Sequence, residues 1–375
     1  MRFATISASD PEGESGRANM VAWLLDEGAG DMDALAFNRG LEAHAIQLSF
    51  SAGTDHFTVH VKTLSEHLDK AMELLAMALS KPRLDDDAIE RVKAQMHRVL
   101  RQKEENPSYI AKRELMRQIY GSHPYANMAL GDHQGIDTIS KADLQDFLSR
   151  YITKGNLAMS AVGDVKAETL QALVKKHFTV LPDAFSPSHN LAQAEFLAAG
   201  QTEVVRKSQP QTVVMVATKG IARNDPDFYK AYVLNHLLGG GTLTSKLGDE
   251  VREKRGLAYY AYTSLTWLDK GHFLSGGFGT RNEQAADALK VMMNTIRTVQ
   301  AGEITQAELG EAKGYLTGAW PLSLTSNSGL AGILLTMQLD GLGKDYIERR
   351  NSYIEAVTLD DVKANGLIQQ YHIHS

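Results

Sequence analysis

The feature that most constrains the fold of this 375-residue chain is a repeat of its own pattern, at an offset of about 215–220 residues. Residues 136–144 match residues 354–362 in the order of their apolar and polar positions. Within these segments Ser140 and Thr358 are natural helix N-caps, and each is followed three residues later by an acidic residue. Each segment therefore predicts the capped start of a helix.

Two further matches occur in the same order along the chain. Residues 84–93 match residues 304–313, and both read as a capped start followed by helical spacing. A pair of leucines also stands shortly before Gly28 and again directly before Gly239. Three matches in one order indicate a duplicated domain.

Each half mixes the periodicities of strands and helices. Apolar and polar residues alternate over 46–50 and over 57–61, and the turn formers at 52–55 join these runs, which predicts an antiparallel hairpin. The other predicted elements are helices over 64–80, 85–104 and 141–152, strands over 156–162, 202–208, 212–218, 257–265 and 271–279, and helices from about 281. Hairpins beside long helices predict an α+β fold of two duplicated domains, each a mainly antiparallel sheet with helices packed on one side.

A stretch rich in turn formers, without periodicity, lies near 180–200. It predicts an N-terminal domain over 1–182, a linker over 183–200 and a C-terminal domain over 201–375. The first half reaches its first helix without opening strands, and the second half ends where the first has a closing strand. We therefore expect a truncated chain.

Composition excludes several classes of protein. The net charge of −6 gives no reason to expect a nucleic-acid partner, which needs a basic face. The chain has no cysteine, so disulfides and thiol catalysis are excluded. No apolar run is long enough to span a bilayer, and no signal peptide is visible.

Two segments of the second half combine glycine with charged or aromatic residues. Gly239, Gly240 and Gly241 precede Lys246, but the spacing of a Walker phosphate loop is absent. Farther on, a charged helix end passes through a glycine into an aromatic strand that begins near Tyr259. Without further information such residues read as a solvated helix face and a sheet aromatic.

Arg252 and Tyr259 in this second segment also have a chemical interpretation. A guanidinium offers a rigid fork of donors with a permanent charge, and a phenol offers a hydroxyl on a stiff element. Close together, they suit an oxyanion or a peptide carbonyl.

The histidines give a weaker signal. His56 and His60 share one face of a predicted strand, and His44 could lie near them, but no acidic residue accompanies this group. We interpret it as ordinary sheet surface. His372 and His374 stand at the end of the chain and carry little weight.

The segment from Gly239 to Tyr259 resembles the C-terminal domain of the pitrilysin/insulinase family of zinc metallopeptidases, in particular its two-domain branch of bacterial and mitochondrial-processing-peptidase-like proteins. The resemblance rests on Gly-Gly-Gly-x3-Ser-Lys-Leu followed by Arg252-x6-Tyr259, the spacing of the family's arginine–tyrosine pair. Residues 10–16, 115–125 and 156–165 also resemble the family, so the resemblance covers essentially the whole chain. It implies two related α+β domains.

The chain departs from the family at the zinc site. The family carries His-x-x-Glu-His on a helix and a distal glutamate about 75 residues later, so that two histidines and this glutamate bind zinc. On this resemblance Trp23, Asp26 and Glu27 occupy the three motif positions, and the distal glutamate falls within 95–97. We therefore expect no metal in this chain, with Trp23 and Leu24 in the core.

The resemblance implies that zinc-binding subunits pair with metal-free ones. The leading hypothesis is a non-catalytic subunit of a heterodimeric zinc metallopeptidase, in which Arg252 and Tyr259 bind the peptide and its tetrahedral intermediate in the active site of a homologous zinc-binding partner. The alternative is a peptide-binding or structural scaffold protein derived from a peptidase. An independent enzyme with an unfamiliar metal site would need ligands that the sequence lacks. We expect a soluble protein of the bacterial cytoplasm or periplasm.

Overall fold

The computed structural model describes residues 1–4, 10–187, 191–197, 200–241 and 244–364. Contacts divide the chain into two compact units, each assembled from three segments. They are Met1–Lys103, Asn127–Ala192 and Ser326–Leu339 for the first unit, and Glu104–Ala126, Gln193–Thr325 and Asp340–Ser375 for the second. The predicted boundaries, 1–182, 183–200 and 201–375, stay a prediction. The observed units differ from these boundaries in two segments. Residues 104–126 lie in the predicted N-terminal domain but group with the second unit, and residues 326–339 lie in the predicted C-terminal domain but group with the first.

The first unit contains a sheet, a small two-stranded ribbon and helices. Its strands are β1 (Arg2–Ala4), β2 (Gly28–Ala29), β3 (Met32–Asp33), β4 (Gln47–Ala52), β5 (His56–Lys62) and β6 (Leu157–Ala158). Its helices are α1 (Arg17–Leu24), α2 (Ala34–Glu42), α3 (Leu68–Ser80), α4 (Asp86–Glu104), α6 (His133–Thr138), α7 (Lys141–Tyr151), α8 (Ala167–His177) and α13 (Asn327–Leu339).

The second unit has one sheet and more helices. Its strands are β7 (Gln211–Lys219), β8 (Tyr260–Leu268) and β9 (Gly271–Arg281). Its helices are α5 (Pro107–Tyr120), α9 (Phe228–Asn235), α10 (Ala285–Gln300), α11 (Gln306–Gly318), α12 (Trp320–Ser323), α14 (Tyr346–Glu355) and α15 (Leu359–Ala364). Two π-helical turns, η6 (His236–Gly240) and η8 (Gly248–Glu253), follow α9.

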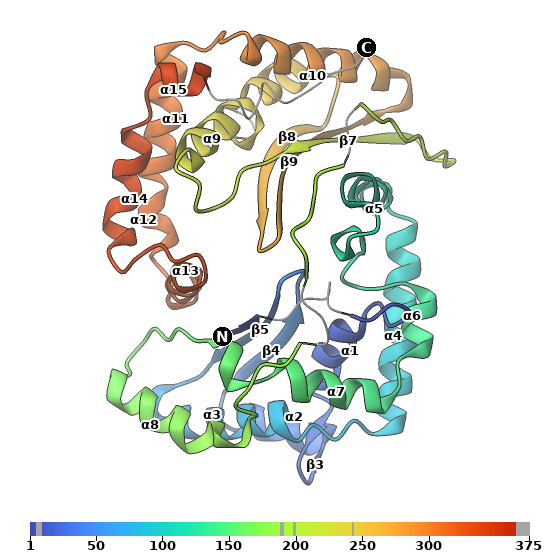
Figure 1. Cartoon of the computed structure of the whole chain (residues 1–375), viewed down its shortest axis with the longest axis vertical. Helices are drawn as coiled ribbons and strands as arrows, with labels where there is room; N and C mark the ends of the chain where they lie inside the picture. The colour runs from blue at the N-terminus through green and yellow to red at the C-terminus, as the bar shows by residue number, and fades with distance from the viewer. Residues whose placement is uncertain (5–9, 188–190, 198–199, 242–243, 365–375) are drawn as a thin grey trace. The chain divides into compact units, whose positions relative to one another are not determined.

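The sheet of the first unit has the order β4-β5-β1-β6, with every pair antiparallel. Figure 1 shows its strands β4 and β5 side by side. The predicted hairpin is confirmed as β4 and β5, in which Phe50 lies opposite Val59. Phe57 of β5 is fully buried and its ring lies 6.1 Å from the ring of Phe147 on α7. Helices α2 and α3 contribute Leu41 and other buried aliphatic residues to a neighbouring cluster.

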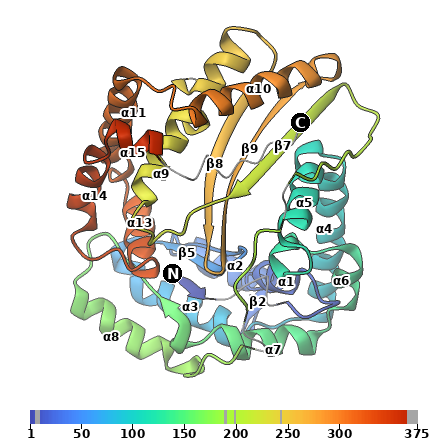
Figure 2. The ribbon, with the colours of Figure 1, turned by 45° about the horizontal axis from the view of Figure 1, so that its top comes forward.

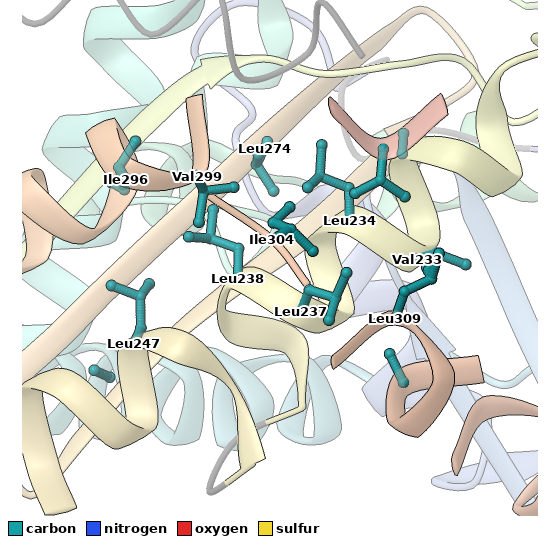
Figure 3. Packing of buried hydrophobic residues seen from close by; sticks show 14 of the residues in the cluster. Val233, Leu234, Leu237, Leu238, Leu247, Leu274, Ile296, Val299, Ile304 and Leu309 are labelled. Carbon is teal, nitrogen blue, oxygen red and sulfur yellow. The ribbon is translucent and has the colours of Figure 1, made fainter. Parts of the chain in front are cut away.

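The sheet of the second unit has the order β7-β9-β8, again antiparallel, and Figure 2 shows the three long strands side by side. Its core lies between the sheet and the helices α9 and α10, where Phe278 and Met292 are fully buried. Leu237 and Leu238, which lie within the first π-turn, pack with residues of α10 and α11 in this cluster (Figure 3). Burying each large apolar side chain contributes about 1.5–3 kcal/mol.

The two sheets share one plan, and the predicted α+β fold with duplicated domains is confirmed. Within each sheet the strands that follow one another along the chain take the same places: β4-β5-β1 of the first unit corresponds to β8-β9-β7 of the second in spatial order. The predicted caps also form: Ser140 and Asp143 make reciprocal hydrogen bonds at the start of α7, and Thr358 and Asp361 do the same at α15. Thr305 caps α11 in the same way.

Three local predictions are wrong. The strand predicted over 202–208 does not form, because no strand among the described residues pairs with it and its Val204 side chain is 71% exposed. The strand predicted over 156–162 is only β6, two residues long. The chain also has an opening strand that the sequence analysis missed, β1, which pairs between β5 and β6.

Candidate functional site

The helix α1, which corresponds to the family's zinc helix, is short and firmly anchored at its start. Gly16 precedes it in a left-handed conformation with φ of 100°, and the Asp10 carboxylate accepts the N–H groups of Gly16 and Ala18. Arg17, which is 2% exposed, pairs with Glu14 at 3.2 Å. A carboxylate at a helix N-terminus satisfies donors that the helix itself leaves free.

The end of α1 does not present the three motif positions on one helix face. The helix ends at Leu24, so Asp26 and Glu27 follow it in a turn. Leu24 is buried as predicted, but Trp23 is only partly buried, and the prediction that it belongs to the core is wrong. The short helix brings residue 23 to the rim of the core rather than into it.

The residue at the second histidine position is used in an ion pair. The Glu27 carboxylate lies 2.9 Å from a terminal nitrogen of Arg91 on α4, and Arg91 also pairs with Asp87 one turn earlier on the same helix. This network links the turn after α1 to α4, the helix on which the resemblance places the distal ligand. An arginine at this place adds positive charge where a zinc site would need donors.

The distal region holds a histidine contact instead of a glutamate. The ring of His97 stacks on that of His133 with centroids 4.9 Å apart, and their Nδ1 atoms are 2.7 Å apart. The Nε2 atom of His97 lies 2.8 Å from the Asp137 carboxylate. Each nitrogen of His97 thus already has a protein partner.

A zinc ion, which the family implies, does not fit the residues at these positions. The Trp23 indole offers no lone pair to a metal, and Glu27 is paired with Arg91. Within the described part of the chain, no group of three or more His, Asp or Glu residues is placed to hold a metal ion. No catalytic step through a metal follows from this half of the molecule.

The other histidines do not form a cluster in the described residues. His44 makes a contact with the Gly40 carbonyl through Nδ1 at 2.9 Å and packs edge-on against His67. His56 pairs in register with Ala4 of β1, and His60 is exposed. His372 and His374 lie outside the described residues.

Arg252 and Tyr259 lie on either side of the turn that leads into β8. Arg252 belongs to the second π-helical turn, and its carbonyl accepts the N–H of Gly256, whose φ of 59° requires a left-handed conformation. The Tyr259 N–H donates to the Gly279 carbonyl at 3.0 Å, which fixes the tyrosine beside the end of β9. The local structure predicted here, a helix end that turns through glycine into a strand, therefore forms.

Both side chains of this pair are open to solvent. The Arg252 side chain is 41% exposed, and its one ion-pair partner among the described residues is the adjacent Glu253 at 3.6 Å. Tyr259 is 57% exposed, and its hydroxyl makes no hydrogen bond within the described residues. The two side chains do not hydrogen-bond to each other, so they are available to a third group.

Close backbone packing explains the glycines before this segment. A side chain at Gly239 would bring its Cβ to 2.4 Å from the Thr263 nitrogen on β8. A side chain at Gly240 would meet Asn235, and one at Gly241 would meet the carbonyl of His236. The glycines let the chain after α9 lie against the sheet, which is a structural role and not phosphate binding.

Comparison with known proteins places the chain in one family. Its residues 4–133 match the family model described as Insulinase (Peptidase family M16), and residues 138–316 match the model described as Peptidase M16 inactive domain. The non-peptidase homolog YmxG of Helicobacter pylori is 29% identical over 317 residues, which cover 84% of this chain and 72% of that protein. An uncharacterized zinc protease of Mycobacterium tuberculosis is 26% identical over 352 residues, 93% of this chain and 80% of its own length.

Solved structures agree with this assignment. The peptidase M16 inactive domain from Pseudomonas fluorescens superposes with a TM-score of 0.90 at 29% identity, covering 98% of this chain and 90% of that one. A protease from Helicobacter pylori shares the fold, with a TM-score of 0.85 at 23% identity over 97% of this chain and 89% of that one. No helix in the described residues is long and apolar enough to cross a membrane. The chain therefore belongs to the insulinase (M16) family of peptidases.

Proposed function

We propose that this chain is the non-catalytic subunit of a heterodimeric zinc metallopeptidase. In this proposal a homologous partner supplies the His-x-x-Glu-His helix and its zinc, and this chain supplies Arg252 and Tyr259. The observation that carries the proposal is a contrast between the zinc-motif positions and the arginine–tyrosine pair. Residues at the zinc positions cannot hold a metal, whereas the arginine and the tyrosine keep their polar ends exposed and open to an external group.

The chemistry of the pair suits the proposed role. Peptide hydrolysis places negative charge on the carbonyl oxygen as the tetrahedral intermediate forms. A guanidinium and a phenol aimed at that oxygen stabilise the charge without needing to move a proton. Gly256, between the two residues, allows the left-handed turn that leads from Arg252 toward Tyr259.

A scaffold or a peptide-binding protein without catalysis is the second candidate. The name of the Helicobacter pylori relative, a non-peptidase homolog, favours it. Such a protein would fold and bind peptide with no requirement for Arg252. The two candidates therefore differ in what the loss of this arginine does.

Reconstitution with a partner that carries His-x-x-Glu-His tests the proposal. The Arg252→Ala variant should lower turnover of an unfolded polypeptide by about a hundred- to a thousandfold, because it removes one donor from the developing oxyanion. Its melting temperature should stay near that of the parent, since a surface ion pair contributes about 0–1 kcal/mol.

The matched control is Arg255→Ala, which removes a neighbouring exposed arginine that is already paired with Glu250. This control should retain full turnover. If Arg252→Ala also retained full turnover in an assembled complex, the scaffold candidate would replace the peptidase-subunit proposal.

A further inference from the structure

A cavity of about 240 Å³ opens beside Tyr259, at the end of the β8–β9 hairpin. Residues 256–259 form one wall, and Thr280, Arg281 and Gln284 form the other. Strand pairing brings these walls together, because Tyr260 lies opposite Gly279 at the end of the ladder and the Tyr259 N–H donates to the Gly279 carbonyl. The Thr280 hydroxyl donates to the Leu257 carbonyl and so holds the two walls to each other.

The positive charge of Arg281, an exposed residue that lines the cavity, has no ion-pair partner in the described part of the chain. Arg281 donates from Nε to the Gln284 side-chain oxygen at 3.3 Å, and among the described residues no carboxylate forms an ion pair with it. Its two terminal nitrogens make no hydrogen bond there. A guanidinium carries five N–H donors and a permanent charge, so most of its donors stay available for a ligand.

The opposite wall adds a second free donor and an open entrance. The Tyr259 hydroxyl has no hydrogen-bond partner in the described part of the chain, although its ring lines the cavity. Gly256 has no atom within 4 Å of the place where a Cβ would stand, so the rim is open on that side. A planar acceptor with two oxygens matches a guanidinium fork together with a phenol.

We propose that this cavity binds a carboxylate of the peptide, either that of an acidic side chain or the C-terminal one. The proposal rests on the proposed peptide-binding function and deepens it, because it names the chemistry that the site selects next to Tyr259. Arg281 supplies the fork that binds the two carboxylate oxygens. Tyr259 then serves both the cavity and the arginine–tyrosine pair.

Peptide binding to the chain alone tests this assignment, by fluorescence polarisation at low salt. The probes are a short labelled peptide with two central glutamates and blocked ends, the same peptide with glutamines, and the glutamine peptide with a free C-terminal carboxylate. The chain should bind at least one carboxylate-bearing probe about tenfold more tightly than the blocked glutamine peptide. Which probe gains identifies the source of the carboxylate.

Variants of Arg281 test whether this residue causes the preference for a carboxylate. Arg281→Gln should abolish the preference, and Arg281→Lys should retain part of it, because the charge remains but the fork is lost. The matched control is Arg297→Gln, since Arg297 is also exposed and bonded to a single side-chain amide, that of Asn294, but lies away from the cavity. Equal binding of all three probes, or a preference that survives Arg281→Gln, would overturn the assignment.

Amide signals of the ¹⁵N-labelled chain give an independent location. Titration with the preferred probe should shift the signals of Leu257, Ala258 and Gln284, and shifts confined to other residues would contradict the proposal. These measurements need neither the partner nor zinc. If the chain formed no active complex with a zinc-binding partner but still preferred a carboxylate, only the peptidase-subunit proposal would be refuted. If the complex were active but the chain showed no preference for a carboxylate, only the assignment of the cavity would be refuted.

Discussion

The zinc-motif region of the first unit and the arginine–tyrosine segment of the second treat their polar residues in opposite ways. Glu27 is bound to Arg91, and His97 is bound to His133 and Asp137, so these side chains are satisfied within the fold. Arg252 and Tyr259 have almost no partners among the described residues, and both are exposed. Among these residues, the paired polar side chains belong to the first unit and the exposed ones to the second.

This difference separates polar side chains that the fold itself satisfies from polar side chains that remain available. Buried or paired polar groups contribute to stability, and their loss affects folding. Exposed groups with few partners contribute little to folding, and functional residues often lie in such loop positions. Substitutions in the first region should therefore change stability without changing turnover, and substitutions in the second should do the reverse.

The strongest test of this difference between the two regions is Tyr259→Phe in the reconstituted complex. The ring remains and the hydroxyl is lost, so turnover should fall by about a hundredfold if the phenol stabilises the oxyanion. Stability should be unchanged, because the hydroxyl has no partner within the described chain. Steady-state turnover and thermal melting are the measurements. Tyr260→Phe, at the next residue, is the control and should have full activity; equal activity of both variants would contradict a role for the Tyr259 hydroxyl.

A second prediction concerns the glycines that place the arginine–tyrosine segment against the sheet. Gly239→Ala should destabilise the second unit by about 1–3 kcal/mol, because its Cβ would collide with the backbone of Thr263. Urea denaturation measures this loss. Gly310→Ala is the control, since Gly310 lies in α11 with no atom within 4 Å of the added Cβ. That control should be neutral or stabilising by about 0.5–1 kcal/mol, and a neutral Gly239→Ala would show that β8 moves easily.

Features that depend on neighbours in sequence could be predicted from the sequence. The three caps at Ser140, Thr305 and Thr358 are local interactions between residues three apart, and all three form. The β4–β5 hairpin likewise depends on two adjacent alternating runs and one turn. The repeat of these signals was sufficient to identify the duplicated α+β plan.

Features that depend on distant partners could not be predicted in this way. The alternating pattern of 202–208 has the composition of a strand, but a strand needs a partner, and none pairs with it. The Glu27–Arg91 contact joins residues 64 positions apart, and no local pattern indicates it. Arg281 comes beside Tyr259 only through the register of β8 and β9, which alignment of the two predicted strands could have revealed.

A third, smaller effect is expected for Glu27→Gln in the first unit. The substitution keeps the shape of the side chain but removes its charge opposite Arg91, whose side chain is 54% exposed. The free energy of unfolding should fall by less than about 1 kcal/mol, and the decrease should be smaller at high salt, because exposed ion pairs are screened. Urea denaturation at two salt concentrations measures it, with Glu42→Gln as an unpaired control. A large loss of turnover in the complex would place this region in the active site after all.

The smallest effect concerns the cap that both halves share, and it depends on pH. Hydrogen bonds from the Thr358 hydroxyl and N–H, and then one from the Lys230 ammonium, lower the pKa of Asp361 to about 2, against about 3.9 in an unfolded chain. A lowered folded-state pKa gives stability that is complete above about pH 4 and is lost as the pH falls toward 2. Because the Asp361 side chain is still 26% exposed, solvent screens its interactions, and we expect Asp361→Asn to cost only about 0.3–1 kcal/mol at neutral pH. The free energies of unfolding of the parent and the variant, measured by urea denaturation, should become equal as the pH falls from 4 to 2. The neighbouring control Asp360→Asn should have the same free energy of unfolding as the parent at every pH. A difference that persisted at pH 2 would mean that the asparagine disturbs the cap by its shape, and that the charge of Asp361 does not carry the effect.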